Sequence, residues 1–217
     1  MPHPSHIIFD LDGTLVDSAP AILTSFRQAF AAAGRQPVMP IDDSIIGPPL
    51  AETLTHLSGS QDPALLATLA EGFKASYDTT GLLATQAFPG VDAALVELQR
   101  RGHTLHIATN KRIHPTRLIL KLMDWQDLFA AVYALDIFEP RLPHKAAMIG
   151  RLLQDQAIPA DQAIYVGDRE EDGLAAQANH LPFLAATWGY GSLRPEELQA
   201  DWRLLRTPEE LVACITG

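Results

Sequence analysis

The sequence has 217 residues, which corresponds to about 1.4 domains of roughly 150 residues each. We therefore expect one large domain, or one domain that contains an insertion. Lysine and arginine total 16 against 26 aspartate and glutamate residues, so the formal net charge is −10. This acidic excess argues against a nucleic-acid partner, because binding to a phosphate backbone requires clustered cations.

The composition is that of a globular protein, with 47% hydrophobic and 19% charged residues. Cys214 is the single cysteine, which excludes an internal disulfide and a multi-cysteine metal site. The first residues carry no basic signal-peptide segment, and the longest uncharged stretch, 173–193, contains Pro182 and three glycines and does not read as a membrane span. We expect a soluble cytoplasmic protein without a membrane partner, either a monomer or a homodimer.

The first apolar run, residues 7–9, reads as a buried strand and ends in an acidic turn that contains a glycine. The interval that follows has helical patterns at residues 20–33, 50–57 and 63–77, separated by glycines and prolines, and no convincing strand. We therefore predict an all-helical domain over residues 17–85, inserted into a core domain formed by residues 1–16 and 86–217.

The remainder of the chain alternates between short apolar runs and helical patterns. Helices are predicted at 91–101, 115–123, 145–154 and 170–179, strands at 104–108, 130–135, 163–166 and 183–186, and a closing helix at 209–215 after Pro208. This alternation is typical of parallel βαβ units. The predicted fold class is therefore α/β, with a doubly wound, Rossmann-like parallel sheet and an inserted all-helical domain.

Acidic residues follow two of the predicted strands. Asp10 and Asp12 come after the first strand, and Asp168 and Asp172 come after the strand at 163–166. In open α/β sheets ligands bind beyond the carboxyl ends of the strands, and carboxylates gathered there repel one another unless a cation such as Mg²⁺ holds them. We therefore predict a magnesium site at this edge, although Asp172 could instead only cap the helix that begins there.

Two lysines are candidates for the positive charge that a phosphate site requires. Lys145 stands at a predicted helix start, where it opposes the helix dipole and needs an anionic partner. Lys111 is its rival and follows Thr109 and Asn110 at the end of a strand. The Thr109 hydroxyl suits a phosphoryl oxygen, although a threonine in such a turn can be only an N-cap. His144 belongs either to the site or to a solvated loop.

Four segments, in their order along the chain, resemble the signature motifs of the haloacid dehalogenase superfamily. They are residues 10–18, Thr109, Lys145 and residues 167–172. The resemblance covers essentially the whole chain, because the helical insertion is similar to that family's cap. Residues 46–50, 109–112 and 187–191 resemble the phosphoglycolate phosphatase branch. The resemblance implies a magnesium-dependent phosphatase that hydrolyses a small phosphorylated metabolite through an aspartyl-phosphate.

The resemblance also implies roles for individual residues. Asp10 is implied as the nucleophile and a metal ligand, and Asp12 as the general acid/base and a metal ligand through its backbone carbonyl. Lys145 is implied to neutralise charge around Asp10, although Ala146 follows it where many relatives have proline. The resemblance also implies Thr109, Asn110 and Gly13 for binding the phosphoryl group. In the metal site, it implies Asp168 as a ligand and Asp172 as the residue that holds a metal-bound water.

Other functions remain open at this stage. A phosphomutase of the β-phosphoglucomutase type uses the same motifs, and a non-catalytic module resembling a receiver domain would share the acidic strand ends. The substrate is also open among phosphoglycolate, nucleotides and sugar phosphates. Gly47 marks the expected specificity loop, because glycine allows close backbone approach, and Arg27, Arg35 and Arg112 are equal candidates for an anionic group of the substrate.

Overall fold

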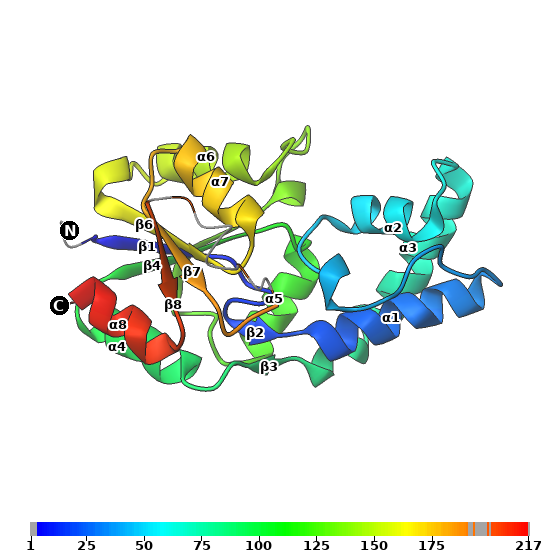
Figure 1. Cartoon of the computed structure of the whole chain (residues 1–217), viewed down its shortest axis with the longest axis horizontal. Coiled ribbons are helices and arrows are strands. Elements are labelled where there is room, and N and C mark those ends of the chain that lie inside the picture. Colours follow the sequence, from blue (N-terminus) through cyan, green and yellow to red (C-terminus); the bar gives the residue numbers. More distant parts are fainter. Residues whose placement is uncertain (1–3, 191–192, 194–198, 200, 217) are drawn as a thin grey trace.

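A computed structural model describes residues 4–190, 193, 199 and 201–216, so Gly191 of the segment 187–191 lies outside the described residues. Its main sheet has six parallel strands in the order β5-β4-β1-β6-β7-β8 (Figure 1). They are β1 (His6–Phe9), β4 (Thr104–Thr109), β5 (Phe129–Ala134), β6 (Ala163–Gly167), β7 (Phe183–Ala186) and β8 (Trp202–Leu205). The predicted α/β fold is confirmed. The strand order reverses direction around β1, and ligand sites form at such a point.

Helices cover both faces of this sheet (Figure 1). They are α4 (Val91–Arg100), α5 (Ile113–Leu122), α6 (Lys145–Asp155), α7 (Glu170–Ala178) and α8 (Pro208–Thr216). Successive side chains of a strand point to opposite faces. Ile7 and Phe9 accordingly join the hydrophobic cluster of α4, α5 and α8, whereas Ile8 joins the cluster of α6 and α7. Because residues 7–9 of β1 are buried on both faces, this stretch is continuously apolar.

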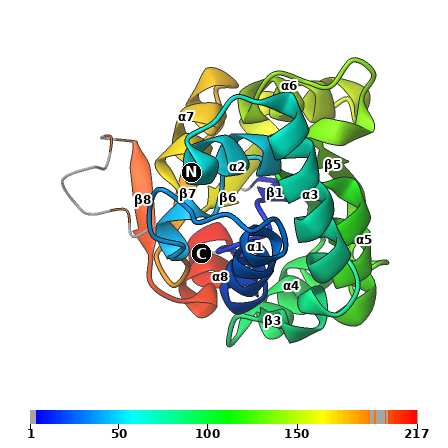
Figure 2. The ribbon, with the colours of Figure 1, turned by 90° about the vertical axis from the view of Figure 1, so that its right-hand side faces the viewer.

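The inserted helices form a separate lobe that has a hydrophobic cluster of its own. They are α1 (Ala19–Ala32), α2 (Leu50–Ser58) and α3 (Pro63–Tyr77), and Phe26, Leu57 and Leu69 lie in their shared core. Residues 18–85, all of which the structure describes, contain no strand. Figures 1 and 2 show this helical cap in front of the carboxyl ends of the central strands. The cap therefore faces the sheet edge where the predicted site residues stand.

Two short strands connect the cap to the core. β2 (Val16–Asp17) and β3 (Gln86–Ala87) pair antiparallel, with Val16 opposite Ala87 and Asp17 opposite Gln86. The first linker leaves the core at β2 and the second returns at β3, so the two crossings of the chain lie side by side. The predicted limit at residue 17 lies in β2, and the predicted limit at residue 85 directly precedes β3.

Short helical turns and one edge strand complete the fold. The 3₁₀ turns are η1 (Asp43–Ile45), η2 (Gly81–Ala84), η3 (Leu135–Ile137) and η4 (Ala160–Gln162). The edge strand β8 was not predicted, because its four residues include the exposed Arg203 and do not form an apolar run.

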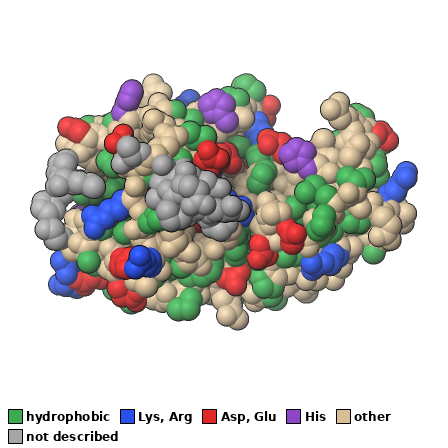
Figure 3. All heavy atoms as spheres, in the orientation of Figure 1, with side chains coloured by type: hydrophobic (Ala, Val, Ile, Leu, Met, Phe, Trp, Pro, Cys, Tyr) green, Lys and Arg blue, Asp and Glu red, His purple; other side chains and the backbone are tan. Residues whose placement is uncertain are grey.

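Helix length and surface charge are the features that bear on membrane and nucleic-acid binding. No helix among the described residues is long and apolar enough to cross a membrane. On the face drawn in Figure 3, basic side chains are interspersed with acidic ones and do not gather into one tract.

Candidate active site

The turn that follows β1 brings the first two acids to the carboxyl edge of the sheet. Asp10 lies directly after the strand and is 3% exposed. Gly13 has φ +84°, and a Cβ atom there would lie 2.4 Å from Asp168 Oδ2. Only glycine combines this backbone conformation with such a close approach. The turn is therefore packed against the loop that follows β6, and we call it the nucleophile loop (residues 10–14) because the resemblance implies Asp10 as the nucleophile.

Three buried carboxylates meet at this edge. Asp10, Asp168 and Asp172 each place an oxygen within 4.8 Å of the other two. Asp10 Oδ1 and Asp168 Oδ2 are buried without a hydrogen-bond partner. Burial raises the pKa of Asp10 to about 6, against the opposing effect of Lys145. Burial and the charges of the other two acids raise the pKa of Asp168 to about 8. Crowded, unpartnered carboxylate oxygens are the donor set that a hard divalent cation requires, so these residues fit a magnesium ion.

Lys145 supplies the cation of this cluster from the first position of α6. Its Nζ lies 3.1 Å from Asp10 Oδ2 and donates to Asp172 Oδ1, and the side chain is 2% exposed. The two carboxylates raise the pKa of Lys145 well above its usual value, in spite of burial. The expected anionic partners of a lysine at a helix start are therefore present. His144 is exposed and caps α6 by accepting a hydrogen bond from the N–H of Ala147 at 3.1 Å.

Asp172 joins the cluster from the first turn of α7. Its Oδ2 accepts from the N–H groups of Asp168 and Arg169, at 3.1 and 3.0 Å, while Oδ1 faces Lys145. A Cβ atom on Gly167 would lie 2.4 Å from this carboxylate. Asp172 thus caps the helix with one oxygen and pairs with Lys145 through the other.

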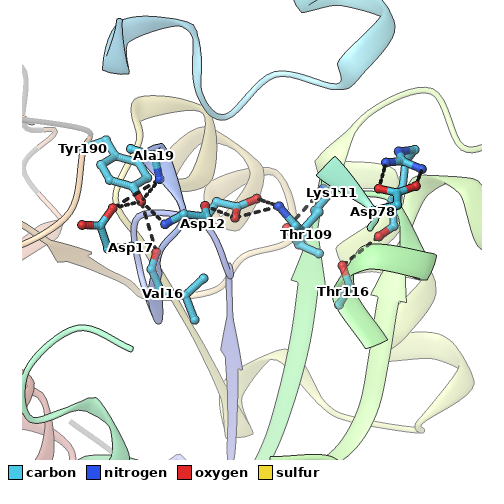
Figure 4. A network of polar contacts seen from close by, with 11 residues as sticks. Asp12, Val16, Asp17, Ala19, Asp78, Thr109, Lys111, Thr116 and Tyr190 are labelled. Carbon is cyan, nitrogen blue, oxygen red and sulfur yellow. Dashed lines mark hydrogen bonds and ion pairs between the residues drawn. The ribbon is translucent and has the colours of Figure 1, made fainter. Parts of the chain in front are cut away.

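Asp12 belongs to a different group of contacts. Lys111 Nζ lies 2.9 and 3.0 Å from its two carboxylate oxygens, and the Ser18 hydroxyl donates to Oδ1. The lysine is 6% exposed on its side chain and stands 4.6 Å from the ring centroid of Tyr77, which comes from the cap. Figure 4 shows Asp12 and Lys111 facing each other across this edge. The two candidate lysines therefore pair with different acids, Lys111 with Asp12 and Lys145 with Asp10 and Asp172.

Two polar residues at the end of β4 complete the edge. Thr109 is 1% exposed, and its hydroxyl accepts from the N–H of Lys111 at 3.3 Å. Thr109 is not the N-cap of α5, because Arg112 occupies that position. Asn110 Nδ2 donates to the carbonyl oxygen of Gly47 at 3.1 Å and to Glu171 at 3.0 Å. Gly47 of the cap is thus brought to the core edge.

A cavity lies between the cap and this edge. Its polar lining residues are Asp12, Thr53, Asn110, Lys111 and Arg112, with Tyr77 and apolar side chains such as Phe26 and Phe73 on the cap side. Arg112 is bound by both oxygens of Asp78, at 2.8 and 2.5 Å. Arg27 donates to the carbonyl oxygen of Ile41, and Arg35 lines a separate hollow. Of the two cationic residues in this lining, Arg112 is paired with a carboxylate of the cap, whereas Lys111 is not.

Sequence reasoning missed several residues that contact the site. Ser18 binds Asp12, Glu171 binds Asn110, and Arg169 donates to the carbonyl oxygen of Asp43 in the cap at 2.9 Å. Glu171 and Arg169 stand within the motif 167–172, which was a usable signal. Ser18 closes the motif 10–18, but its contact depends on how the first linker is held.

Comparison with known proteins agrees with this geometry. Residues 7–186 match the family model described as haloacid dehalogenase-like hydrolase. The chain is 33% identical to a phosphoglycolate phosphatase of Xanthomonas campestris pv. campestris, covering 96% of each chain. It is 32% identical to a 5'-nucleotidase of Pseudomonas aeruginosa, covering 90% of this chain and 87% of that one. The crystal structure of a "predicted phosphatase" from Clostridium acetobutylicum superposes with a TM-score of 0.86 at 28% identity over 98% of each chain. The chain therefore belongs to the haloacid dehalogenase-like hydrolases, and it is a phosphatase of that family.

Proposed function

We propose that this phosphatase is magnesium-dependent and hydrolyses a small phosphomonoester through an aspartyl-phosphate formed on Asp10, as the resemblance to phosphoglycolate phosphatases implies. The observation that carries the proposal is the buried cluster of Asp10, Asp168 and Asp172 at the carboxyl end of β1, with Lys145 on one oxygen of Asp10. An unpartnered oxygen on the same carboxylate supports its role in the chemistry.

The metal would be held by the carboxylates of Asp10 and Asp168 and by the backbone carbonyl of Asp12, and Asp172 would hold a water bound to the metal. Bound there, Mg²⁺ would offset the negative charge of the acids and of the phosphoryl group. Lys145 provides the charge that the protein itself contributes next to the nucleophile. These positive charges address the main obstacle to the reaction, which is the approach of a carboxylate to a phosphate dianion.

The chain's own residues account for each proton and bond. Asp10 attacks phosphorus, the ester bond breaks, and Asp12, which begins the cycle in its protonated form, donates its proton to the departing oxygen. In the second half, Asp12 takes a proton from a water that attacks the phosphorus of the aspartyl-phosphate, and the bond to Asp10 breaks. Free phosphate and an alcohol are the products. Proton transfer of this kind contributes about 10²-fold to 10⁴-fold in rate.

The remaining site residues bind and enclose the substrate. We assign the phosphoryl oxygens to Thr109, Asn110 and the backbone of Gly13, which converge at this edge. Residues 17–85 act as a cap that excludes water, with Gly47 in the loop that meets the core. We place the reaction in the cytoplasm, in keeping with a single free cysteine.

The leaving group occupies the cavity between Asp12 and the cap. Lys111 favours a leaving group that carries a carboxylate, because its buried ammonium lies within 3 Å of Asp12. The ester oxygen must contact Asp12, so a carboxylate one or two carbons away reaches the lysine. This is the shape of 2-phosphoglycolate, and the first relative described above is a phosphoglycolate phosphatase.

Substitution of the nucleophile tests the proposal. Asp10→Asn should lower magnesium-dependent phosphate release from an aryl phosphate and from 2-phosphoglycolate by about 10³-fold or more, because the amide cannot form the intermediate. Asp161→Asn, an exposed acid in η4, is the matched control and should keep wild-type activity. Full activity of Asp10→Asn would contradict the proposal. Transfer of phosphate to a sugar phosphate without net release would favour the mutase.

A further inference from the structure

The loop that follows β7 has no role in the chemistry proposed above, although it is fixed to the nucleophile loop. Trp188 Nε1 donates to the carbonyl oxygen of Thr14 at 2.8 Å. Gly189 lies so close that a Cβ atom there would be 1.6 Å from the carbonyl oxygen of Gly13. The next residue, Tyr190, therefore stands on a segment of the core that is fixed to the nucleophile loop.

Tyr190 extends from this loop to both linkers between the core and the cap. Its Oη accepts from the N–H of Ser18 and from that of Ala19, the latter at 2.9 Å, and donates to Asp17 Oδ1 at 2.7 Å. A phenol has one proton and two lone pairs, so this hydroxyl is fully used. The ring lies 6.0 Å from that of Phe88 in the second linker. Figure 4 shows the hydroxyl pointing to the start of α1.

The Ser18 side chain contacts Asp12 and does not cap its own helix. Ser18 is the N-cap residue of α1, yet its side chain makes no capping hydrogen bond. A serine in this position ordinarily accepts from the N–H of the second or third helical residue, and Pro20, the second, has no N–H. The Ser18 hydroxyl donates to Asp12, while Tyr190 binds the N–H groups of Ser18 and Ala19.

We propose that Tyr190 is a positioning residue for the general acid, because its hydroxyl fixes the first linker so that Ser18 holds Asp12 toward the leaving group. The inference rests on the proposed function, in which Asp12 protonates the departing oxygen. Ser18 begins the first cap helix, whereas Tyr190 belongs to the core. The tyrosine therefore ties the serine to the core next to Asp12. Its loss would also leave the Ser18 N–H without its partner, whereas the Ala19 N–H would keep a second acceptor in Asp17 Oδ1 at 3.2 Å.

The dependence of the rate on the leaving group separates this role from a general effect on folding. A 4-nitrophenolate leaves without a proton, whereas an alkoxide must be protonated as the bond breaks. The value of kcat/KM reports the steps up to the aspartyl-phosphate, which include this departure. Tyr190→Phe should therefore lower kcat/KM for 2-phosphoglycolate by about 10-fold to 100-fold more than for 4-nitrophenyl phosphate, a part of the full contribution of an acid.

Two further variants test whether Tyr190 acts on Asp12 through Ser18. Ser18→Ala should give the same selective loss, and the double variant should lose no more than either single variant, because both act on Asp12 through one contact. Tyr133→Phe is the matched control. Its hydroxyl also donates to a carboxylate, that of Asp155 at 2.9 Å, and joins β5 to α6. This control should leave the ratio of the two kcat/KM values at the wild-type value.

The outcomes are distinct. An equal loss with both esters in Tyr190→Phe, or no loss, overturns the inference while phosphatase activity of the wild type still supports the proposed function. No phosphate release from either ester by the wild type contradicts the proposed function and removes the basis of the inference. If Tyr190→Phe does not fold by circular dichroism, Ser18→Ala decides, and an unchanged ratio in that variant overturns the inference.

Discussion

The buried carboxylates predict that one substitution will abolish activity and stabilise the metal-free protein. Asp168 is 1% exposed, and its Oδ2 has no hydrogen-bond partner. Burial and the neighbouring acids raise its pKa to about 8. Asp168→Asn removes the charge, keeps the volume and retains an acceptor for the Thr14 hydroxyl, which lies 3.3 Å from Oδ1. We expect loss of magnesium-dependent activity together with a larger free energy of unfolding without metal.

The magnitude follows from proton linkage. The unfolded chain ionises this carboxyl near its ordinary pKa of 3.8, so between that value and about 8 the folded protein binds the extra proton. Stability is consequently lost as the pH rises through this window. At pH 7 the cost is about 4 kcal/mol at ~1.4 kcal/mol per pKa unit. Because Asp10 and Asp172 share the repulsion, we expect a gain of roughly 2–4 kcal/mol, or roughly 4–15 °C in Tm.

Urea unfolding followed by circular dichroism at pH 7 measures this gain. In EDTA the Asp168→Asn variant should be more stable than the wild type, and added Mg²⁺ should stabilise the wild type alone. Asp161→Asn removes an exposed charge and should match the wild type in both buffers. A variant less stable than the wild type in EDTA would refute the reasoning about buried charge. Equal stabilisation of both proteins by Mg²⁺ would exclude Asp168 as a ligand.

Two other perturbations test separate parts of the molecule. Burial, together with the neighbouring His6, lowers the pKa of His106 to about 4. The unfolded chain therefore gains a proton below pH 6.5 that the folded protein does not bind. Relative to His106→Gln, the wild type should lose roughly 2 kcal/mol of unfolding free energy between pH 7.5 and 4.5, and a constant difference would contradict this. Lys111→Met should reduce the kcat/KM preference for 2-phosphoglycolate over its uncharged amide by about 10-fold to 100-fold, whereas the exposed Lys121→Met should not.

Much of the fold could be predicted because its central elements have simple patterns. The strand β1 is apolar at three successive positions since both of its faces are covered, and the parallel strands alternate with amphipathic helices. The strand β8 lacks that signal because it lies at the sheet edge and carries the exposed Arg203. The pair β2 and β3 was also beyond prediction, because two residues per strand are too few to show a period.

The site divides in the same way. Asp10, Asp168 and Lys145 could be selected from the sequence because parallel strands and the helices that follow them start from one edge. The bond between Ser18 and Tyr190 joins residues 172 positions apart, and no local pattern contains it. It arises only once the loop after β7 has packed on the nucleophile loop.

The two lysines show how burial decides a choice that spacing left open. A buried ammonium needs its own carboxylate. Lys145 takes Asp10 and Asp172, and Lys111 takes Asp12. Asp12, when ionised, forms a neutral pair with Lys111. The three other acids, when ionised, exceed by one negative charge the positive charges of Lys145 and of Arg169, whose Nε lies 3.7 Å from Asp168 Oδ2. A divalent cation therefore has negative charge to offset in the second group and none in the first. The proposed metal site therefore belongs on the nucleophile's side of the cavity, and the Asp12 carboxylate is left for the leaving group.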